Sequence, residues 1–411
     1  MSSKFYEVPG GVTAPAGFLV NAVECGIKDP AKLRLDLGLI YSEEVAVTAG
    51  AFTTNQVKAA PVRLCQKHLR SNDVRAIIVN SGNANACTGP RGIEDACSMA
   101  NSTAKALKLK PQQVLIGSTG IIGLPMPMER ILPFVPALAK GLARTKNEAL
   151  ARAIMTSDTK PKSLSIEVAL GSKKVRIGAV AKGAGMICPN MGTMLCYVTT
   201  DAKIGLADLK RATLVAVDRS FNRISIDGDT STNDTVIVMA NGASGQRKLQ
   251  PRSPSMQLFT EALDYLMLQM AKMIVRDGER VTKFVEVHVT GAANQVDARK
   301  VAETVANSLL VKCSWNGSDP NWGRIMHAIG YSGAKIREND IDIYFDGLAA
   351  ARNGLVADTP IQKLRSIAAQ PEFRVCIDLN IARAEYTVFT SDLSQEYVNF
   401  NTSEYAVPTV K

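Results

Sequence analysis

The chain has 411 residues, of which 46 % are hydrophobic and 21 % charged, and its formal net charge is +10. This length predicts more than one lobe and a large buried core, which needs neither disulfides nor metals for stability. No apolar run approaches the roughly 18 residues of a membrane span. The opening residues MSSKFYEVPGGVTAP resemble neither a signal peptide nor a transit peptide. The eight cysteines are widely spaced without a CxxC pair, so we expect reduced thiols and a cytoplasmic protein.

The positive charges are scattered along the chain. One of the denser basic stretches, KSLSIEVALGSKKVR at residues 162–176, has the pattern of a surface strand and turn. Aromatic residues make up only 5 % of the chain, and no RNP-like or helix-turn-helix pattern occurs. We therefore expect no nucleic-acid partner and no membrane partner. Small carboxylate-bearing metabolites account more easily for the charge.

The first 180 residues predict strands mixed with helices and turn-rich loops. The loop NSGNANACTGPRG follows the second predicted strand, and GSTGIIG follows the third as a strand-ending turn. The expected strands are 45–53, 74–80, 113–116, 164–170 and 174–180, and the expected helices are 93–107, 128–143 and 147–155.

The remainder begins with KGAGMICPNMGTMLCYVTTDA, residues 182–202, where a loop changes into a strand just after Thr193. Strands and helices in the last part do not alternate as βαβ units would, so a doubly wound sheet is not expected. From about residue 280 the pattern indicates an α+β lobe. The expected helices are 207–218, 256–274 and 296–310, and the expected strands are 236–240, 281–290, 341–345, 375–379 and 384–390.

Several common catalytic motifs are absent from the sequence. GAGMIC lacks the third glycine of a dinucleotide fingerprint, and no P-loop occurs. The three histidines show no HExxH or zinc spacing, so we expect no cofactor and no metal. Without a GxSxG elbow, a Ser-His-Asp hydrolase is poorly supported. The usual general base is therefore missing.

The dipeptide Gly192–Thr193 admits two interpretations. Thr193 either simply opens a β-strand, which threonine favours, or becomes a new N-terminus. In the second case its hydroxyl attacks the carbonyl of Gly192, and the freed α-amino group, with an ordinary pKa of about 7.7–8.0, then serves as the base. Such a site needs no histidine.

The loop at 182–202 resembles the processing site of the ornithine acetyltransferases (glutamate N-acetyltransferases) of arginine biosynthesis, which cleave themselves before a threonine. The resemblance extends over nearly the whole chain and preserves the order of the motifs. Besides that loop, the matching motifs are GVTAPAGF (11–18), NSGNANACTG (80–89), STGIIG (118–123), SFNRISIDGDTSTNDT (220–235), VRDGE (275–279) and DPNWGRI (319–325).

The resemblance implies a fold and a domain division. The fold would be α+β, an αββα sandwich of the N-terminal-nucleophile type with a smaller C-terminal lobe. Residues 1–192 would form the first chain after cleavage, 193–279 would complete the core, and 280–411 would form the lobe. Two cleaved pairs would assemble into a heterotetramer.

The resemblance also implies the site residues. Thr193 would be the nucleophile, cleaved from Gly192, and Thr119 with Gly120 would form the oxyanion hole. Lys182 would neutralise a substrate carboxylate, and Glu279 would pair with the ornithine ammonium. The implied substrate contacts are Thr156, Lys182, Thr193, Glu279 and Asn401. Asp227, Asp229, Asn233 and Asp234 would lie near the site, or would form a turn held by side-chain hydrogen bonds.

The implied reaction is ping-pong transfer of acetyl from N-acetyl-L-ornithine to L-glutamate, with acetyl-CoA left open as a second donor. The alternatives are an aminopeptidase or amidase of the same fold and an unprocessed ligand-binding protein. The chain departs from the family in Gly192, which replaces the usual alanine, in Cys188, where many relatives have histidine, and in a longer C-terminus. Cys188 and Cys196 also raise the alternative of a thiol nucleophile.

Overall fold

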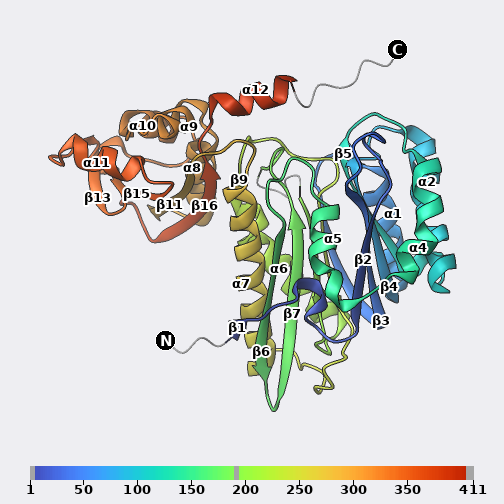
Figure 1. Ribbon diagram of the computed structural model, residues 1–411. Coiled ribbons are helices and arrows are strands. Elements are labelled where there is room, and N and C mark those ends of the chain that lie inside the picture. Colours follow the sequence, from blue (N-terminus) through green and yellow to red (C-terminus); the bar gives the residue numbers. More distant parts are fainter. Residues whose placement is uncertain (1–4, 189–193, 404–411) are drawn as a thin grey trace. The chain divides into compact units, whose positions relative to one another are not determined.

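The computed structural model describes residues 5–188 and 194–403 (Figure 1). These residues form two compact units. Unit 1 comprises 5–183, 194–222 and 230–274, and unit 2 comprises 184–188, 223–229 and 275–403. Within the described residues, no helix is both long and apolar enough to cross a membrane.

The strands described in unit 1 form one nine-stranded sheet. Eight of them follow the order β1-β6-β7-β8-β10-β3-β4-β5, which is the sheet path, and the ninth, β2, lies off this path and pairs with β3. The long strand β3 belongs to two halves of this path. Its residues 35–46 pair with β2 and β4, and its residues 47–52 pair with β10. The strands are β1 (Phe5–Glu7), β2 (Phe18–Glu24), β3 (Leu35–Phe52), β4 (Val74–Asn83), β5 (Val114–Ile121), β6 (Lys162–Leu170), β7 (Lys173–Lys182), β8 (Leu195–Thr200) and β10 (Thr235–Ala240).

The two halves of this path pack face to face. Tyr197 of β8 lies against Gly117 of β5, where an added Cβ atom would lie 1.9 Å from the tyrosine hydroxyl oxygen. Tyr197 and Ile237 share one core with Ile77 and Leu115 of the other half. All residues of β8 and β10 are buried, because these strands are covered on both faces.

Helices cover the outer faces of the two halves. α1 (Ala60–His68) and α2 (Gly89–Leu107) contact β5, and α6 (Leu206–Arg219) contacts β3 and β10. α7 (Pro254–Arg276) contacts β1 through the rings of Phe5 and Tyr265, whose centroids are 5.0 Å apart. The predicted αββα sandwich is confirmed. The other described helices of this unit are α3 (Met128–Ile131), α4 (Val135–Lys140) and α5 (Asn147–Ala153).

Unit 2 is the smaller α+β unit, built on a seven-stranded sheet with the order β14-β13-β12-β15-β11-β16-β9. Helix α8 packs on β11 and β16, and Val287, Val301 and Trp315 are fully buried in the core. The strands are β9 (Ile224–Ser225), β11 (Phe284–Ala292), β12 (Asp342–Phe345), β13 (Leu348–Arg352), β14 (Leu355–Val356), β15 (Glu372–Asp378) and β16 (Ala384–Ser391). The helices are α8 (Gln295–Asn307), α9 (Leu309–Asn316), α10 (Trp322–Gly330), α11 (Ile361–Ala368) and α12 (Gln395–Ser403).

Two helices that were predicted as continuous are each divided in the structure, so these two predictions are wrong. The helix expected at 128–143 is divided into α3 and α4, because Pro133 and Pro136 remove backbone donors and clash with the preceding turn. The helix expected at 296–310 is divided at Ser308, which is extended and accepts a hydrogen bond from the Val311 N–H as the N-cap of α9.

The contact between the two halves of the sandwich can be tested at Gly117. We expect Gly117→Ala to reduce the free energy of unfolding by about 1–3 kcal/mol, because the new methyl group would overlap the Tyr197 hydroxyl. That hydroxyl has no hydrogen-bond partner among the described residues, so Tyr197→Phe removes the closest overlap without breaking a bond, while the contacts of the added Cβ atom with Val79 Cγ2 at 2.9 Å and the ring Cζ at 3.1 Å remain. Urea unfolding of both variants and of the double variant measures the effect. An equal loss in the tyrosine and phenylalanine backgrounds would contradict this packing.

Candidate active site

The ends of β5 and β7 carry the first group of expected site residues. Lys182, the last residue of β7, has only 3 % of its surface exposed. Its ammonium group donates hydrogen bonds to Thr156 Oγ1 at 2.6 Å and to Thr119 Oγ1 at 3.3 Å. The structure therefore brings together Thr119, Thr156 and Lys182 within unit 1.

The position of Gly120 in this group requires glycine. β5 continues through Thr119 and Gly120 to Ile121, so the expected strand-ending turn is part of the strand itself. Gly120 has φ 136°, a conformation that other residues rarely adopt, and an added Cβ atom would lie 2.3 Å from the carbonyl carbon of Gly82. The neighbouring strand β4 thus contacts the Thr119–Gly120 pair directly.

A buried carboxylate, that of Asp158, joins the same group. It accepts hydrogen bonds from the backbone N–H groups of Thr156 and Gly183 at 3.0 and 2.8 Å, and from the Lys162 ammonium at 2.6 Å. Lys182 Nζ lies 3.8 Å from its second oxygen. Burial alone would raise the pKa of the Asp158 carboxyl, but Lys182, Lys162 and the Gly183 N–H outweigh burial and hold that pKa below its usual value.

The sequence did not point to Asp158 or Lys162. The surface expected at 162–176 is wrong for most of β6, in which all residues except Ser163 and Ala169 are buried and Lys162 is only 3 % exposed. Asp158 stands two residues after Thr156 in TSDT, but its side chain accepts from a residue that precedes it, whereas in the usual Asx turn the acceptor precedes the N–H donor. The local sequence therefore carried no signal for Asp158.

Part of the polar loop SIDGDTSTNDT lies beside this group. Asn233 donates hydrogen bonds to the carbonyl oxygens of Ala84 and Ser118 at 2.6 and 2.8 Å, and so holds the strand next to Thr119. Asp234 accepts a hydrogen bond at 2.9 Å from the N–H of Met194, the residue that follows Thr193 in the chain. Both side chains are buried. Gly192 and Thr193 themselves lie outside the described residues.

The surroundings of the Asp234 carboxyl favour its neutral form. Burial raises its pKa well above the usual value, although the Met194 N–H and the charge of Lys182 oppose this shift. Its second oxygen has no hydrogen-bond partner among the residues that the structure describes. The pKa of Asp158 is shifted in the opposite direction, so the surroundings of that carboxyl favour its ionised form.

The first half of the loop belongs to unit 2. Asp227 accepts hydrogen bonds from the N–H groups of Met186, Ile187 and Asp229, at 2.6, 2.8 and 3.3 Å. The bond from Asp229 is that of a turn held by a side-chain hydrogen bond, whereas the other two join the loop to the distant segment at Met186 and Ile187. Burial is the main reason that the pKa of Asp227 is raised.

Unit 2 also contains the second group of expected site residues. Asn401 Nδ2 donates a hydrogen bond to Glu279 Oε2 at 3.1 Å, and Glu279 N donates one to the Ala184 carbonyl at 2.8 Å. An added Cβ atom at Gly185 would lie 2.4 Å from the carboxyl carbon of Glu279. The second glycine of KGAG therefore makes room for this carboxylate.

A thiol nucleophile is not favoured at Cys196. This residue is fully buried in β8, and burial raises the pKa of its thiol far above the usual value, so the reactive thiolate is scarce. Across residues 5–188 and 194–403, no cluster of at least three His, Cys, Asp or Glu side chains could hold a metal ion.

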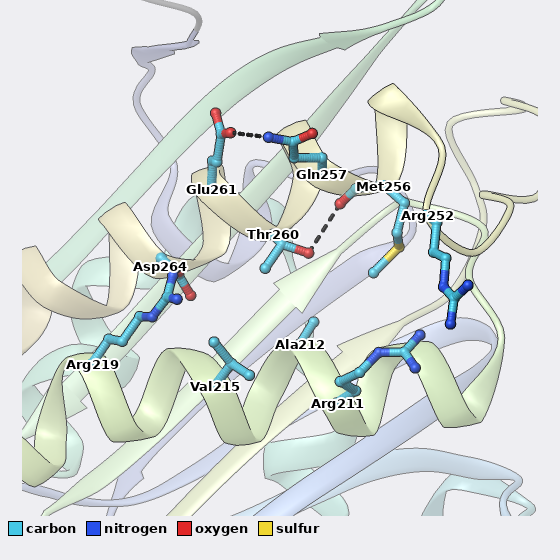
Figure 2. A pocket seen from close by; sticks show the side chains of 10 residues that line it. All are labelled: Arg211, Ala212, Val215, Arg219, Arg252, Met256, Gln257, Thr260, Glu261 and Asp264. Atoms are coloured by element: carbon cyan, nitrogen blue, oxygen red, sulfur yellow. Dashed lines mark hydrogen bonds and ion pairs between the residues drawn. The ribbon is translucent and has the colours of Figure 1, made fainter.

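A separate groove lies between α6 and α7 in unit 1 (Figure 2). Arg219 forms an ion pair with Asp264 at 2.9 Å, and the Thr260 hydroxyl donates to the carbonyl oxygen of Met256. The groove contains none of the expected site residues. Its lining residues are Arg211, Ala212, Val215, Arg219, Arg252, Met256, Gln257, Thr260, Glu261 and Asp264.

The fold and the residues gathered at the ends of β5 and β7 define an α+β protein of the αββα sandwich class. A sequence model of the ArgJ family matches residues 19–406. A protein of Geobacter sulfurreducens named arginine biosynthesis bifunctional protein ArgJ is 46 % identical over 386 residues, which cover 94 % of this chain and 98 % of that protein. A protein of the same name from Symbiobacterium thermophilum is 43 % identical over 394 residues, covering 96 % and 98 %. The chain belongs to the ArgJ family.

Two solved structures are also similar. That of arginine biosynthesis bifunctional protein ArgJ from Bacillus halodurans is 38 % identical with a TM-score of 0.49, and the match covers 50 % of this chain and 97 % of that one. That of the Mycobacterium tuberculosis ornithine acetyltransferase complexed with ornithine is 39 % identical with a TM-score of 0.42, covering 45 % and 98 %.

The raised pKa of the Asp234 carboxyl makes the free energy of unfolding depend on pH. Its pKa is raised in the folded state, so ionisation costs more free energy in the fold than in the unfolded chain, and stability falls as the pH rises above the unfolded value of about 3.9. Asp234→Asn keeps an oxygen for the Met194 N–H and cannot ionise. We expect the stability of the variant relative to wild type to increase between pH 5 and pH 8, measured as urea midpoints. A difference that is constant or shrinks with pH would contradict the raised pKa.

Proposed function

We propose that this chain is a self-processing ornithine acetyltransferase that moves acetyl from N2-acetyl-L-ornithine to L-glutamate in arginine biosynthesis. The observation that carries the proposal is membership of a family whose curated relatives are named arginine biosynthesis bifunctional proteins. The hydroxyl and ammonium groups gathered around Lys182 suit acyl transfer without a histidine.

Processing comes first in this proposal. The Thr193 hydroxyl attacks the carbonyl carbon of Gly192, the peptide C–N bond breaks, and the acyl group passes from nitrogen to oxygen. Water then hydrolyses the ester and leaves Thr193 with a free α-amino group. The products are residues 1–192 and 193–411, in which 193–279 complete the core and 280–411 form the C-terminal lobe. Two copies of each assemble as a heterotetramer in the cytoplasm.

Acetyl transfer follows in two half-reactions. The Thr193 hydroxyl gives its proton to the α-amino group and attacks the acetyl carbonyl, and ornithine leaves with a proton on its amine. The amine of glutamate then attacks the acetyl ester and releases N-acetylglutamate. Thr119 and the N–H of Gly120 donate hydrogen bonds to the oxyanion in each step.

The proposed substrate contacts are those that the family resemblance implies. Lys182 neutralises the substrate carboxylate, and Thr156 donates or accepts a hydrogen bond beside it. Glu279 pairs with the ornithine ammonium, and its hydrogen bond from Asn401 supports this role by fixing the carboxylate orientation. The word bifunctional in the names of the relatives supports a second activity, for which acetyl-CoA is the acetyl donor.

The processing step is tested by the size of the purified chains. Wild-type protein should run as two fragments with termini at Gly192 and Thr193, while Thr193→Ala should stay intact and inactive because it lacks the attacking oxygen. Cys188→Ser serves as the matched control and should be cleaved and active. A wild-type protein that is fully active as one full-length band would contradict processing, and an inactive Cys188→Ser variant would favour a thiol mechanism.

The reaction is tested by incubating the enzyme with acetylornithine and glutamate and quantifying all products. We expect equal amounts of ornithine and N-acetylglutamate with little free acetate, since the acetyl group is passed to an amine. Release of acetate instead would identify an amidase or aminopeptidase, and tight binding without turnover would identify a ligand-binding protein. A parallel incubation with acetyl-CoA and glutamate tests the second donor.

A further inference from the structure

The carboxylate of Asp158 connects two segments that carry expected site residues. One oxygen accepts from the N–H of Gly183, directly after Lys182, and the other accepts from the N–H of Thr156. The Asp158 side chain is completely buried. A carboxylate with these contacts fixes the backbone on both sides of the hydrogen bond between Lys182 and Thr156.

The ammonium group of Lys182 depends on this carboxylate for its charge. A buried ammonium is costly unless an opposite charge and hydrogen-bond acceptors replace water. Among the described residues of unit 1, the Asp158 carboxylate lies 3.8 Å from Lys182 Nζ and also binds Lys162 on β6, and the charge of Lys182 acts on the Asp234 carboxyl beside β10. Of these two carboxyl groups, Asp158 is the one whose surroundings favour the ionised form.

The ammonium in turn orients the Thr119 hydroxyl. Lys182 donates to Thr119 Oγ1, so the hydroxyl hydrogen of Thr119 must point away from the lysine. A hydroxyl that accepts a charge-assisted hydrogen bond also becomes a stronger donor. Both effects favour a hydroxyl that stabilises a developing oxyanion.

We propose that Asp158 is a positioning residue for acyl transfer, which keeps the Lys182 ammonium charged and directed at the Thr119 hydroxyl while Lys162 shares its carboxylate. The inference rests on the proposed function, because it gives Thr119 the role of oxyanion donor. It adds Asp158 and Lys162 to the site, and neither of them needs to touch the substrate.

Asp158→Asn is the direct test, since it removes the charge and little volume. We expect kcat/KM to fall about 10- to 100-fold near pH 7, which is less than the roughly 100- to 1,000-fold loss of kcat that removal of an oxyanion donor causes. The ratio of variant to wild-type kcat/KM should fall further as the pH rises from 6 to 9, because Lys182 without its counter-charge releases its proton at lower pH. A ratio that stays constant with pH would overturn the proposal.

Asp201→Asn is the matched control. Asp201 is also buried and also accepts from two backbone N–H groups, those of Ala16 and Arg176. Among the described residues, its carboxylate accepts from Ala16 and Arg176 and forms no hydrogen bond with Thr119, Thr156 or Lys182. We expect any loss of activity in this variant to be independent of pH, as for a purely structural defect. A falling ratio in this control as well would overturn the assignment to Asp158.

Lys162→Met keeps the test informative if Asp158→Asn folds poorly, and a double variant tests the route through Thr119. Lys162→Met leaves Lys182 as the remaining ammonium beside the Asp158 carboxylate. The ratio of variant to wild-type kcat/KM should therefore stay constant or rise with pH, and a ratio that falls would overturn the proposal. In a Thr119→Ala background, Asp158→Asn should lower kcat/KM by less than a further threefold, because both changes act through one hydroxyl. Full additivity would overturn the route through Thr119.

A titration of Lys182 separates this inference from the proposed function. NMR of protein with ¹⁵N-labelled lysine, assigned with Lys182→Arg, should show Lys182 losing its proton at lower pH in Asp158→Asn than in wild type. This measurement needs no turnover. If wild-type enzyme transfers no acetyl, the proposed function fails while the titration still decides the role of Asp158. An unchanged titration overturns the inference even in a fully active enzyme.

Discussion

The long strand β3 is the constraint on which the architecture of unit 1 depends. Because its two parts pair with different neighbours, the sheet path continues through it from β10 to β4 and β5. The two halves then stack, with Tyr197 pressed against Gly117. This stacking brings the end of β5 to the end of β7, although these strands lie far apart along the sheet path. The hydrogen bond between Lys182 and Thr119 is a consequence of that closure.

Burial gives the group around Lys182 its chemical character. In water an ion pair and a few hydroxyl groups would contribute little, whereas in a low-dielectric interior the same charges interact strongly. The cost is that each charge needs a partner, and Asp158 serves two ammonium groups at once. Nearby, Asp234 is buried in the same way, and burial raises its pKa even though the charge of Lys182 opposes this shift. The pKa values of two aspartates in one region are thus shifted in opposite directions because their neighbours differ.

Much of the fold could be predicted from hydrophobic patterns, and the misses have local causes. Gly38 interrupts the pattern of the first half of β3, yet its missing side chain makes room for Leu150 of α5. Pro133 and Pro136 divide a helix that hydrophobic periodicity alone predicted to be continuous. For the site, Thr119, Thr156 and Lys182 came from resemblance to a family. Asp158 and Lys162 were missed because isolated charges in a sequence usually lie on the surface, and only the tertiary structure shows these two to be buried.

The arrangement also explains why a site of this kind has no need of histidine. Histidine is useful because one group can both give and take a proton near pH 7. Around β5 and β7 these tasks are divided. The Lys182 ammonium donates hydrogen bonds to two hydroxyl groups, and in the proposed mechanism proton transfer is left to the amine that self-cleavage would create. A cation that must stay charged requires a carboxylate that stays ionised, and Asp158 meets that requirement with two backbone N–H donors and a second lysine. The same burial excludes water, which favours passing an acyl group to an amine over losing it to hydrolysis.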